Sequence, residues 1–396
     1  MARRACPQPR VSTVTPFSEG QTMTSLIDEI GADLATIRSW RHRIHARPEL
    51  SFEERVTASF VAEKLGSWGW DVVEGIGRTG VVASLTVGDS ARSIGLRAEL
   101  DALPVFEATE VDHRSTIPGC SHTCGHDGHT TMLLAAARHL ARTRSFDGTV
   151  RCIFQPAEET MSGALAMIAD GLFDRFPVDS IFSMHNMPGL ERGDLYFRTG
   201  PVLSAVDTWE IVLTGKGGHG SMPERCVDPV VAGASLVMAL QTVVSRNVGW
   251  KDAAVVTIGA FLAGEAGNVV PQEAILRLSI RTATPEIRDL VLGRVRAITA
   301  AQALSFGVEH EIREGTAGAV VINDPAVTAT CVGVASGLLG EERVHADGPG
   351  FMASDDFAFF LAPERPGAYA FIGNGDTPMV HHPKYDFDDR ILPIGA

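Results

Sequence analysis

Basic residues and long apolar runs are both scarce in this sequence. Lys and Arg number 34 against 48 Asp and Glu in 396 residues, which gives a formal net charge of −14. A surface of that sign repels phosphates, so no nucleic-acid partner is expected. No apolar stretch approaches the roughly 18 residues that span a bilayer, so no membrane partner is expected either.

Cysteines are also few. The six cysteines are scattered at positions 6, 120, 124, 152, 226 and 331. They are too few for a disulfide framework in a chain of this size, which favours the reducing cytoplasm as the compartment. Residues 1–22 are basic but contain no continuous apolar segment. They predict a disordered tail rather than a secretory signal.

The first part of the chain alternates apolar strand-like runs with helical periodicity. This alternation predicts an α/β domain with a mixed, largely parallel sheet flanked by helices. The expected helices are Ser25–His45, Val56–Trp68, about Thr130–Thr143 and about Gly163–Ala169. The expected strands are Val81–Val87, Ile94–Leu100, Thr149–Phe154, Ser180–Met184 and, near the C-terminus, Ala368–Ile372.

The pattern changes near residue 203. Six elements then follow in the order β-α-β-β-α-β, which predicts an inserted ferredoxin-like α+β domain. They are Asp207–Thr214, Asp228–Ser245, Ala253–Ala260, Glu273–Arg281, Pro285–Ala303 and Val308–Glu314. The predicted organisation is a catalytic domain at 23–202 and 316–396, interrupted by a lid or dimerisation domain at 203–315.

Polar side chains follow several of the predicted strands. Asp101 follows Ile94–Leu100, the pair Glu158-Glu159 follows Thr149–Phe154, and His185 follows Ser180–Met184. The last strand is followed by "HH" at 381–382, and the segment "CGHDGHT" at 124–130 adds a further cluster. Ligands gather at the carboxyl ends of the strands in such sheets, so these groups are expected on one rim.

Cysteine, histidine and carboxylate together suit zinc, manganese or cobalt-type ions. Three interpretations of Cys124 compete with a catalytic metal site: a structural zinc knot, a redox pair and a nucleophile. A structural zinc knot is disfavoured because no second Cys pair follows, and a redox pair is disfavoured because Cys-x-x-Cys is absent. A nucleophilic Cys124 with His126 is not excluded by residue type, but two groups so close in a loop converge more easily on one ion.

The adjacent carboxylates Glu158 and Glu159 will tend to point in different directions. One can then bind a metal while its neighbour stays free to act as a general base. The alternative is an exposed acidic helix start.

At this point the sequence resembles the M20 metallopeptidases, and within them the amidohydrolase branch. The resemblance covers roughly residues 41–387. It rests on "RHRIHARPELSFEE", "LRAELDALP", "CGHDGHT", "FQPAEE", "HN", "GGHGSMPERCVDP", "GNVVPQEAILRLSIRT", "SDDFAFF" and "HHPKYDF".

The resemblance implies a role for each of these groups. Five residues correspond to ligands of a two-metal site, with Cys124 as the bridge: Cys124, His126, Glu159, His185 and His381. Glu158 corresponds to the general base, His219 and Asn268 to groups that hold the substrate and the oxyanion, and Arg281 to the partner of a substrate carboxylate. Asp101 corresponds to a group that orients an imidazole. His382 leaves the C-terminal ligand ambiguous, although the H-x-P spacing favours His381.

Two further histidines are assigned no catalytic role. His45 is expected to be a hydrogen-bonded structural residue, and His129 is expected near a helix N-terminus, facing away from the site.

The resemblance implies a metal-dependent amidohydrolase that cleaves N-acyl amino acids, with two divalent ions (Mn²⁺, Zn²⁺, Co²⁺ or Ni²⁺) per subunit. It also implies a homodimer formed through the lid domain. The alternatives are a dipeptidase or carboxypeptidase of the same superfamily, or a binding protein that has kept the fold without catalysis.

Overall fold

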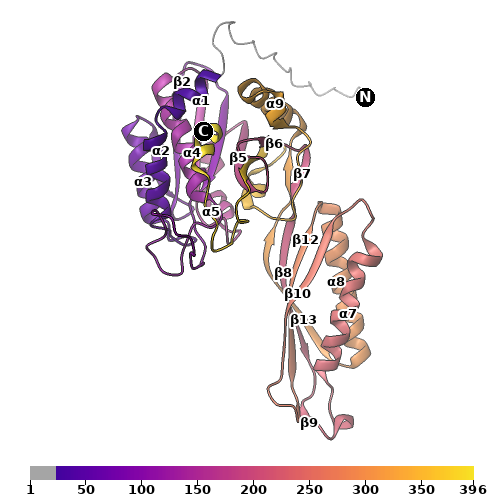
Figure 1. The fold of residues 1–396 in the computed structure, drawn as a ribbon. Coiled ribbons are helices and arrows are strands. Elements are labelled where there is room, and N and C mark those ends of the chain that lie inside the picture. The colour runs from indigo at the N-terminus through magenta and orange to yellow at the C-terminus, as the bar shows by residue number, and fades with distance from the viewer. Residues whose placement is uncertain (1–23) are drawn as a thin grey trace, which may run out of the picture.

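The computed structural model describes residues 24–396, so the tail expected at 1–22 lies outside the described residues. A large sheet and a smaller sheet dominate the described part of the chain, and helices pack on each (Figure 1). The smaller sheet and its two helices project away from the larger part (Figure 1).

The larger sheet has eight strands in the order β1-β2-β4-β3-β5-β16-β6-β15. Its central strands β4, β3, β5 and β16 run parallel, and antiparallel pairings flank them on both sides. The expected mixed, largely parallel sheet is therefore confirmed. The strands are β1 (Asp71–Ile76), β2 (Gly80–Val87), β3 (Ser93–Glu99), β4 (Gly148–Gln155), β5 (Ser180–Pro188), β6 (Leu195–Tyr196), β15 (Val344–His345) and β16 (Gly367–Gly375).

Helices cover both faces of this sheet. Along β4, Cys152 and Phe154 belong to one hydrophobic cluster and Ile153 to another, because successive side chains of a strand point to opposite faces. The first cluster draws on α1 (Thr24–Gly31), α2 (Leu34–His45), α3 (Arg55–Ser67), α4 (His126–Thr143), α9 (Pro325–Leu339) and α10 (Leu392–Gly395). The second draws on α5 (Gly163–Ala169) and α6 (Leu172–Arg175).

The smaller sheet belongs to an α+β unit with its own hydrophobic cluster. Its strands pair antiparallel in the order β10-β12-β8-β13, the order of a ferredoxin-like unit. The elements are β8 (Ala205–Thr214), α7 (Pro229–Asn247), β10 (Ala254–Ala263), β12 (Glu273–Thr282), α8 (Pro285–Phe306) and β13 (Glu309–Gly318). Thr284 caps α8 by accepting from the Ile287 backbone N–H at 3.3 Å, with Pro285 in the first turn.

Two short strand pairs mark the ends of this unit. β7 (Gly200–Leu203) pairs with β14 (Val321–Asn323) where the chain enters and leaves it. β9 (Gly218–His219) pairs with β11 (Val269–Val270), and β9 lies at the end of the unit far from the larger sheet (Figure 1).

One expectation about apolar runs was wrong. Within the described residues, α7 is long and apolar enough to cross a membrane by length and composition. Its buried residues Leu236, Leu240 and Val243, however, join the hydrophobic cluster of the smaller sheet. One face of α7 therefore packs on the sheet of the α+β unit.

Two helix boundaries also differ from expectation. The single helix expected over Ser25–His45 is interrupted by a turn at Ala32 and Asp33, which separates α1 from α2. The helix expected from about Thr130 begins at His126. His126 and His129 therefore lie in the first turn of α4, whereas Cys124 precedes the helix.

Candidate metal centre

Three neighbouring parallel strands bring polar side chains to one edge of the larger sheet. Asp101 follows the end of β3, Glu158 and Glu159 follow the end of β4, and His185 lies near the end of β5. The parallel pairing of β3 with both β4 and β5 places these ends side by side.

The start of α4 adds two more groups. Gly125 separates them, with a left-handed φ of 96°, and a Cβ atom there would lie 2.1 Å from Oδ1 of Asn186. Glycine is therefore required at this position. The turn places Cys124 just before the helix and His126 in its first turn.

The five candidate ligands converge from four separate segments. Sγ of Cys124 lies 3.4 Å from Nε2 of His185, and Glu159 lies 3.9 Å from Nε2 of His126 and 3.5 Å from Nε2 of His381. Two triads, Cys124-His126-His185 and Cys124-Glu159-His381, each hold their ligand atoms within 4.8 Å of one another. Since Cys124 belongs to both triads, these residues would suit a pair of neighbouring ions.

Two unpaired atoms fit the binding of cations at this cluster. Nε2 of His126 and Oε1 of Glu159 are buried, and neither has a hydrogen-bond partner in the described chain. Buried polar atoms normally find a partner, because leaving one unpaired costs about 1–3 kcal/mol. A cation between these atoms would supply the missing partner.

The protonation of Cys124 and His126 would also change if a cation bound. Burial, followed by the charge of Glu159, raises the pKa of the Cys124 thiol well above its usual range. Burial favours neutral His126, but the Asp101 hydrogen bond and nearby carboxylates outweigh it and raise the pKa of His126 to about 10. Cations would compete with both protons, so their binding would release protons.

The imidazoles are oriented by acceptors on their other nitrogen. Nδ1 of His126 donates to the carbonyl oxygen of Asp101 at 2.9 Å and lies 3.3 Å from its carboxylate. Nδ1 of His185 donates to the carbonyl oxygen of Asn186 at 2.6 Å. In each ring the remaining Nε2 is left as the ligand atom.

Glu158 stands beside this cluster. Its Oε2 lies 3.8 Å from Nε2 of His126, and its side chain is buried. Burial, followed by the charges of Asp355 and Glu159, raises the pKa of Glu158 well above its usual range.

A cavity of about 470 Å³ opens on these residues. Cys124, Glu158, Glu159, His185 and His381 all line it. Its other walls are mostly apolar and include Met161, Met187, Leu203, Val206, Tyr369 and Phe371.

Arg281 of β12 also lines this cavity. Its guanidinium donates to the carbonyl oxygen of Met352 and to Oγ of Ser354, both at 3.0 Å. No carboxylate of residues 24–396 forms a salt bridge with it. Burial lowers the pKa of Arg281 from its usual value. The cavity therefore contains a guanidinium that lacks an acidic partner in the described chain.

His219 and Asn268 are not brought to this cavity. His219 is exposed on β9, and the backbone of its neighbour Gly220 bonds to the carbonyl oxygen of Asn268 at 2.8 Å. The two residues thus lie together, but at the end of the α+β unit that is far from the larger sheet (Figure 1).

His381 and His382 are placed differently by the structure. His381 lines the cavity, whereas His382 accepts a hydrogen bond from the Lys384 backbone N–H on the exposed side of the loop. His381 adopts a left-handed φ of 69°, and its backbone N–H donates to the carbonyl oxygen of Thr123, next to Cys124.

His129 lies in the first turn of α4 and does not line the metal cavity, but it packs directly behind the candidate ligands. Its buried ring lies with its centroid 4.5 Å from that of His185, because Glu99 and Asn186 hold its two nitrogens. His45 is a buried structural histidine, with Nδ1 bonded to Asp127 at 2.8 Å.

Sequence reasoning also missed Asn186 and Tyr385. Both stand inside the quoted motifs, "HN" and "HHPKYDF", so their proximity to His185 and His381 was the available signal.

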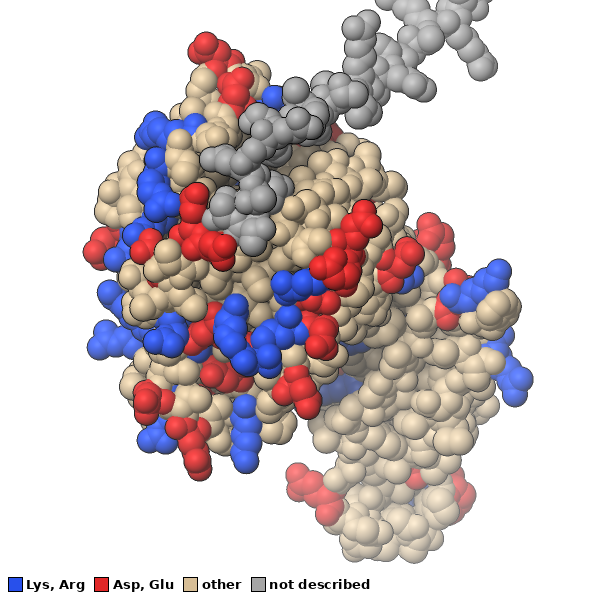
Figure 2. All heavy atoms as spheres, turned by 45° about the horizontal axis from the view of Figure 1, so that its top comes forward, with Lys and Arg blue, Asp and Glu red and all other residues tan. Residues whose placement is uncertain are grey.

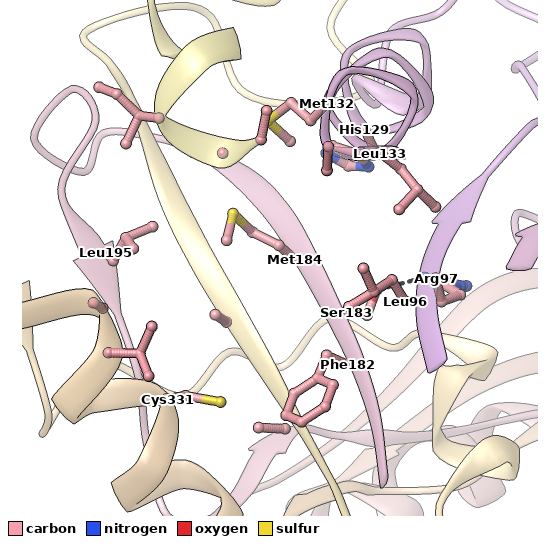
Figure 3. Close-up of a pocket in the computed structure, with 18 of the residues that line it drawn as sticks. Leu96, Arg97, His129, Met132, Leu133, Phe182, Ser183, Met184, Leu195 and Cys331 are labelled. Atoms are coloured by element: carbon pink, nitrogen blue, oxygen red, sulfur yellow. Dashed lines mark hydrogen bonds between the residues drawn. The ribbon is translucent and has the colours of Figure 1, made fainter. Parts of the chain in front are cut away.

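A second cavity, of about 280 Å³, lies on the face of the larger sheet that α4, α9 and α10 cover, opposite to the cavity at the metal ligands (Figure 3). It is lined mainly by apolar side chains of the central strands, α4, α9 and α10. None of the candidate metal ligands lines it. His129 reaches it from α4, together with Arg97 and Ser183 from the strands below (Figure 3).

Comparison with known proteins places these features in context. The sequence model described as peptidase family M20/M25/M40 matches residues 95–396. The chain is 41% identical over 372 residues to the hippurate hydrolase of Campylobacter jejuni subsp. jejuni, which covers 94% of this chain and 97% of that protein. It is 34% identical over 354 residues to the N-acetyl-L-cysteine deacetylase of Bacillus subtilis, covering 89% and 83%.

A solved structure is similar as well. The Bacillus subtilis YXEP protein, described as a dinuclear metal binding peptidase from the M20 family, superposes with a TM-score of 0.79 at 31% identity. The match covers 92% of this chain and 96% of that one.

Proposed function

This chain belongs to peptidase family M20/M25/M40 as one of its amidohydrolases, and from that premise we propose that it cleaves the amide bond of N-acyl amino acids. Water adds to the amide carbonyl, and a carboxylic acid and an amino acid are released. One observation carries the proposal: buried Glu158 lies beside the candidate metal ligands, in the same cavity as the guanidinium of Arg281, which has no acidic partner in the described chain.

The residues present fit two divalent ions of the Mn²⁺, Zn²⁺, Co²⁺ or Ni²⁺ type. Soft sulfur, imidazole and carboxylate together suit this group of metals. The proposed ligands are Cys124, His126, Glu159, His185 and His381. When bound, such ions lower the pKa of water and polarise a carbonyl group.

Glu158 performs the proton transfers. It accepts a proton from the attacking water and then delivers it to the nitrogen of the leaving amino acid. Burial raises the pKa of Glu158, so the side chain holds a proton firmly. Cations held by the neighbouring ligands would lower this pKa and favour the carboxylate form that acts as a base.

Arg281 is proposed to bind the carboxylate of the amino-acid part. A guanidinium pairs with a carboxylate through two parallel hydrogen bonds, and Arg281 has no acidic partner in the described chain to compete. The apolar walls around Met161, Met187 and Phe371 suit an uncharged acyl group. Hippurate and N-acetyl-L-cysteine, which the names of two relatives specify, are both N-acylated amino acids.

His219 and Asn268 are proposed to act on the oxyanion from the second subunit of a homodimer. Their distance from the metal centre in one chain means that a single chain cannot supply them in this arrangement (Figure 1). β10 is an edge strand with exposed Val255, Phe261 and Leu262, and few charges interrupt the face of the α+β unit seen in Figure 2. Both features favour contact between two copies.

Turnover of a substrate panel tests the proposal. Protein treated with a chelator should hydrolyse neither hippurate nor N-acetyl amino acids, and adding Mn²⁺, Zn²⁺, Co²⁺ or Ni²⁺ should restore hydrolysis. Preference for dipeptides over N-acyl amino acids would favour a dipeptidase or carboxypeptidase. Metal binding without turnover of any substrate would favour a non-catalytic homologue.

A further inference from the structure

A fully buried chain of side chains lies directly behind the candidate ligands. It consists of Glu99 on β3, His129 on α4, Asn186 on β5 and Tyr385 in the C-terminal loop. Nδ1 of His129 donates to Glu99 at 2.8 Å, and its Nε2 lies 2.7 Å from Oδ1 of Asn186. Nδ2 of Asn186 donates to the hydroxyl of Tyr385 at 2.6 Å.

Asn186 is the central member of this chain. It follows His185 on β5, so the two side chains point to opposite faces of the sheet. His185 faces the larger cavity, whereas Asn186 reaches His129 on the α4 face, where Figure 3 shows His129 above the β5 side chains. The main-chain carbonyl of Asn186 meanwhile accepts from Nδ1 of His185. One residue therefore fixes the His185 ring and also contacts α4.

The other contacts of Asn186 reach the remaining ligand segments. Its Oδ1 fills the space that a side chain on Gly125 would need, between Cys124 and His126. Its partner Tyr385 bonds through its backbone N–H to the carbonyl oxygen of His382, which closes the turn that follows His381. Cys124, His126, His185 and His381 are thus all attached to segments that meet at Asn186.

Glu99 fixes the position of His129 in this set of side chains. Its other carboxylate oxygen is bonded to Arg97, which in turn donates to both carboxylate oxygens of Asp355 at 2.9 and 3.1 Å. A carboxylate with partners on both oxygens has little freedom to move. His129 therefore holds Asn186 against a fixed point.

We propose that Asn186, held by His129 and linked to Tyr385, is a positioning residue that sets the geometry of the metal ligands. The inference rests on the proposed metal site, but it concerns residues outside the set of proposed ligands. It makes Asn186 the point at which the relative placement of His185 and His381 is decided.

Cobalt binding tests this role without any assay of turnover. Asn186→Leu removes both side-chain links, and Tyr385→Phe removes only the link to the His381 loop. Co²⁺ affinity should fall by about 10- to 100-fold in Asn186→Leu, the usual range for the loss of a group that orients ligands, and by less in Tyr385→Phe. The visible absorption of the cobalt protein, which reports ligand geometry, should change in both.

Trp70→Phe is the matched control. It removes a buried hydrogen bond to the carbonyl oxygen of Ala137 on the same helix α4, at 3.2 Å, away from the site. It should lower the Tm but leave cobalt affinity and spectrum unchanged. If both test variants bind cobalt with wild-type affinity and give the wild-type spectrum, the four side chains have a purely structural role and the inference is overturned. If Asn186→Leu does not fold, Tyr385→Phe decides alone. Failure of the wild-type protein to bind cobalt would instead overturn the proposed metal site, and this inference with it.

Discussion

Sγ of Cys124 lies 3.4 Å from Nε2 of His185, although one residue precedes helix α4 and the other lies near the end of strand β5. The contact is one edge of a triad completed by His126, and Cys124 also belongs to the triad with Glu159 and His381. Loss of the sulfur should therefore disturb both proposed ion positions.

Cys124→Ser should retain less metal than the wild type, because a serine hydroxyl stays protonated at neutral pH and is a poor replacement for a bridging thiolate. Elemental analysis after dialysis against a weak chelator measures this directly. Cys152→Ser is the control, since Cys152 is buried in the core outside the site. Full hydrolytic activity in metal-free Cys124→Ser would contradict the site assignment.

Substitution of Glu158 and of Glu159 should have different effects on metal content. Glu158→Gln should keep its metal but lose kcat by about 10²- to 10⁴-fold, the usual scale for a missing general base. Glu159→Gln should lose metal as well. Metal content and kcat measured on both purified proteins decide the matter, and equal metal loss would mean that the two roles are misassigned.

Arg281→Lys should raise KM for N-acyl amino acids and have much less effect on the corresponding amides. A lysine ammonium cannot form the paired hydrogen bonds of a guanidinium with a carboxylate. Steady-state kinetics on matched acid and amide substrates tests this. Equal effects on the two would show that Arg281 only supports the loop at Met352 and Ser354.

Two inactive variants should rescue one another if His219 acts across a dimer. In a mixed dimer of His219→Ala and Glu158→Gln, one site combines the native metal centre of the first chain with the native His219 of the second. Equal mixing after reversible dissociation makes about half of the dimers mixed, so about one quarter of all sites should recover. Activity that stays at the baseline of the separate variants would place His219 within its own subunit.

Alkaline pH should weaken the fold through His45. Burial favours its neutral form, but the charges and hydrogen bonds of Asp127 and Glu107 outweigh this and raise the pKa of His45 to about 9. Its folded-state pKa lies above the unfolded value, so its contribution is full below about pH 6.5 and is lost as the pH rises through about 9. The contribution is about 3 kcal/mol at most.

Urea unfolding of the wild type and of His45→Gln between about pH 6.5 and 9.5 measures this loss. The wild type should lose more stability over this range than His45→Gln, which has no proton to release there. Parallel pH dependence in the two proteins would remove His45 as the cause.

Much of the site was predictable because parallel strands end at the same edge of a sheet. Asp101, the Glu158-Glu159 pair and His185 were recognised from their positions after apolar runs, and the structure brings them together. The start of α4 was not predictable by the usual signals, since its N-cap is Gly125, which offers no side chain to cap the helix.

The contacts of His129 and the position of His219 could not be predicted from the residues near them in sequence, for different reasons. The ring of His129 is held by Glu99 and Asn186, which come from two different strands. His219 lies on a two-residue strand whose position depends on how the whole α+β unit projects from the larger part (Figure 1). Neither depends on the residues immediately around it in sequence.

Because β7 pairs with β14, the α+β unit is an insertion whose two ends lie side by side in the larger part. Leu203, where the chain departs, has Val321 as its strand partner where the chain returns. Because the two ends already lie next to each other, a short turn could close them without the intervening residues. The polypeptide on either side could then complete the eight-stranded sheet by itself, so this insertion could vary in length or sequence between relatives while the metal-bearing edge stays intact.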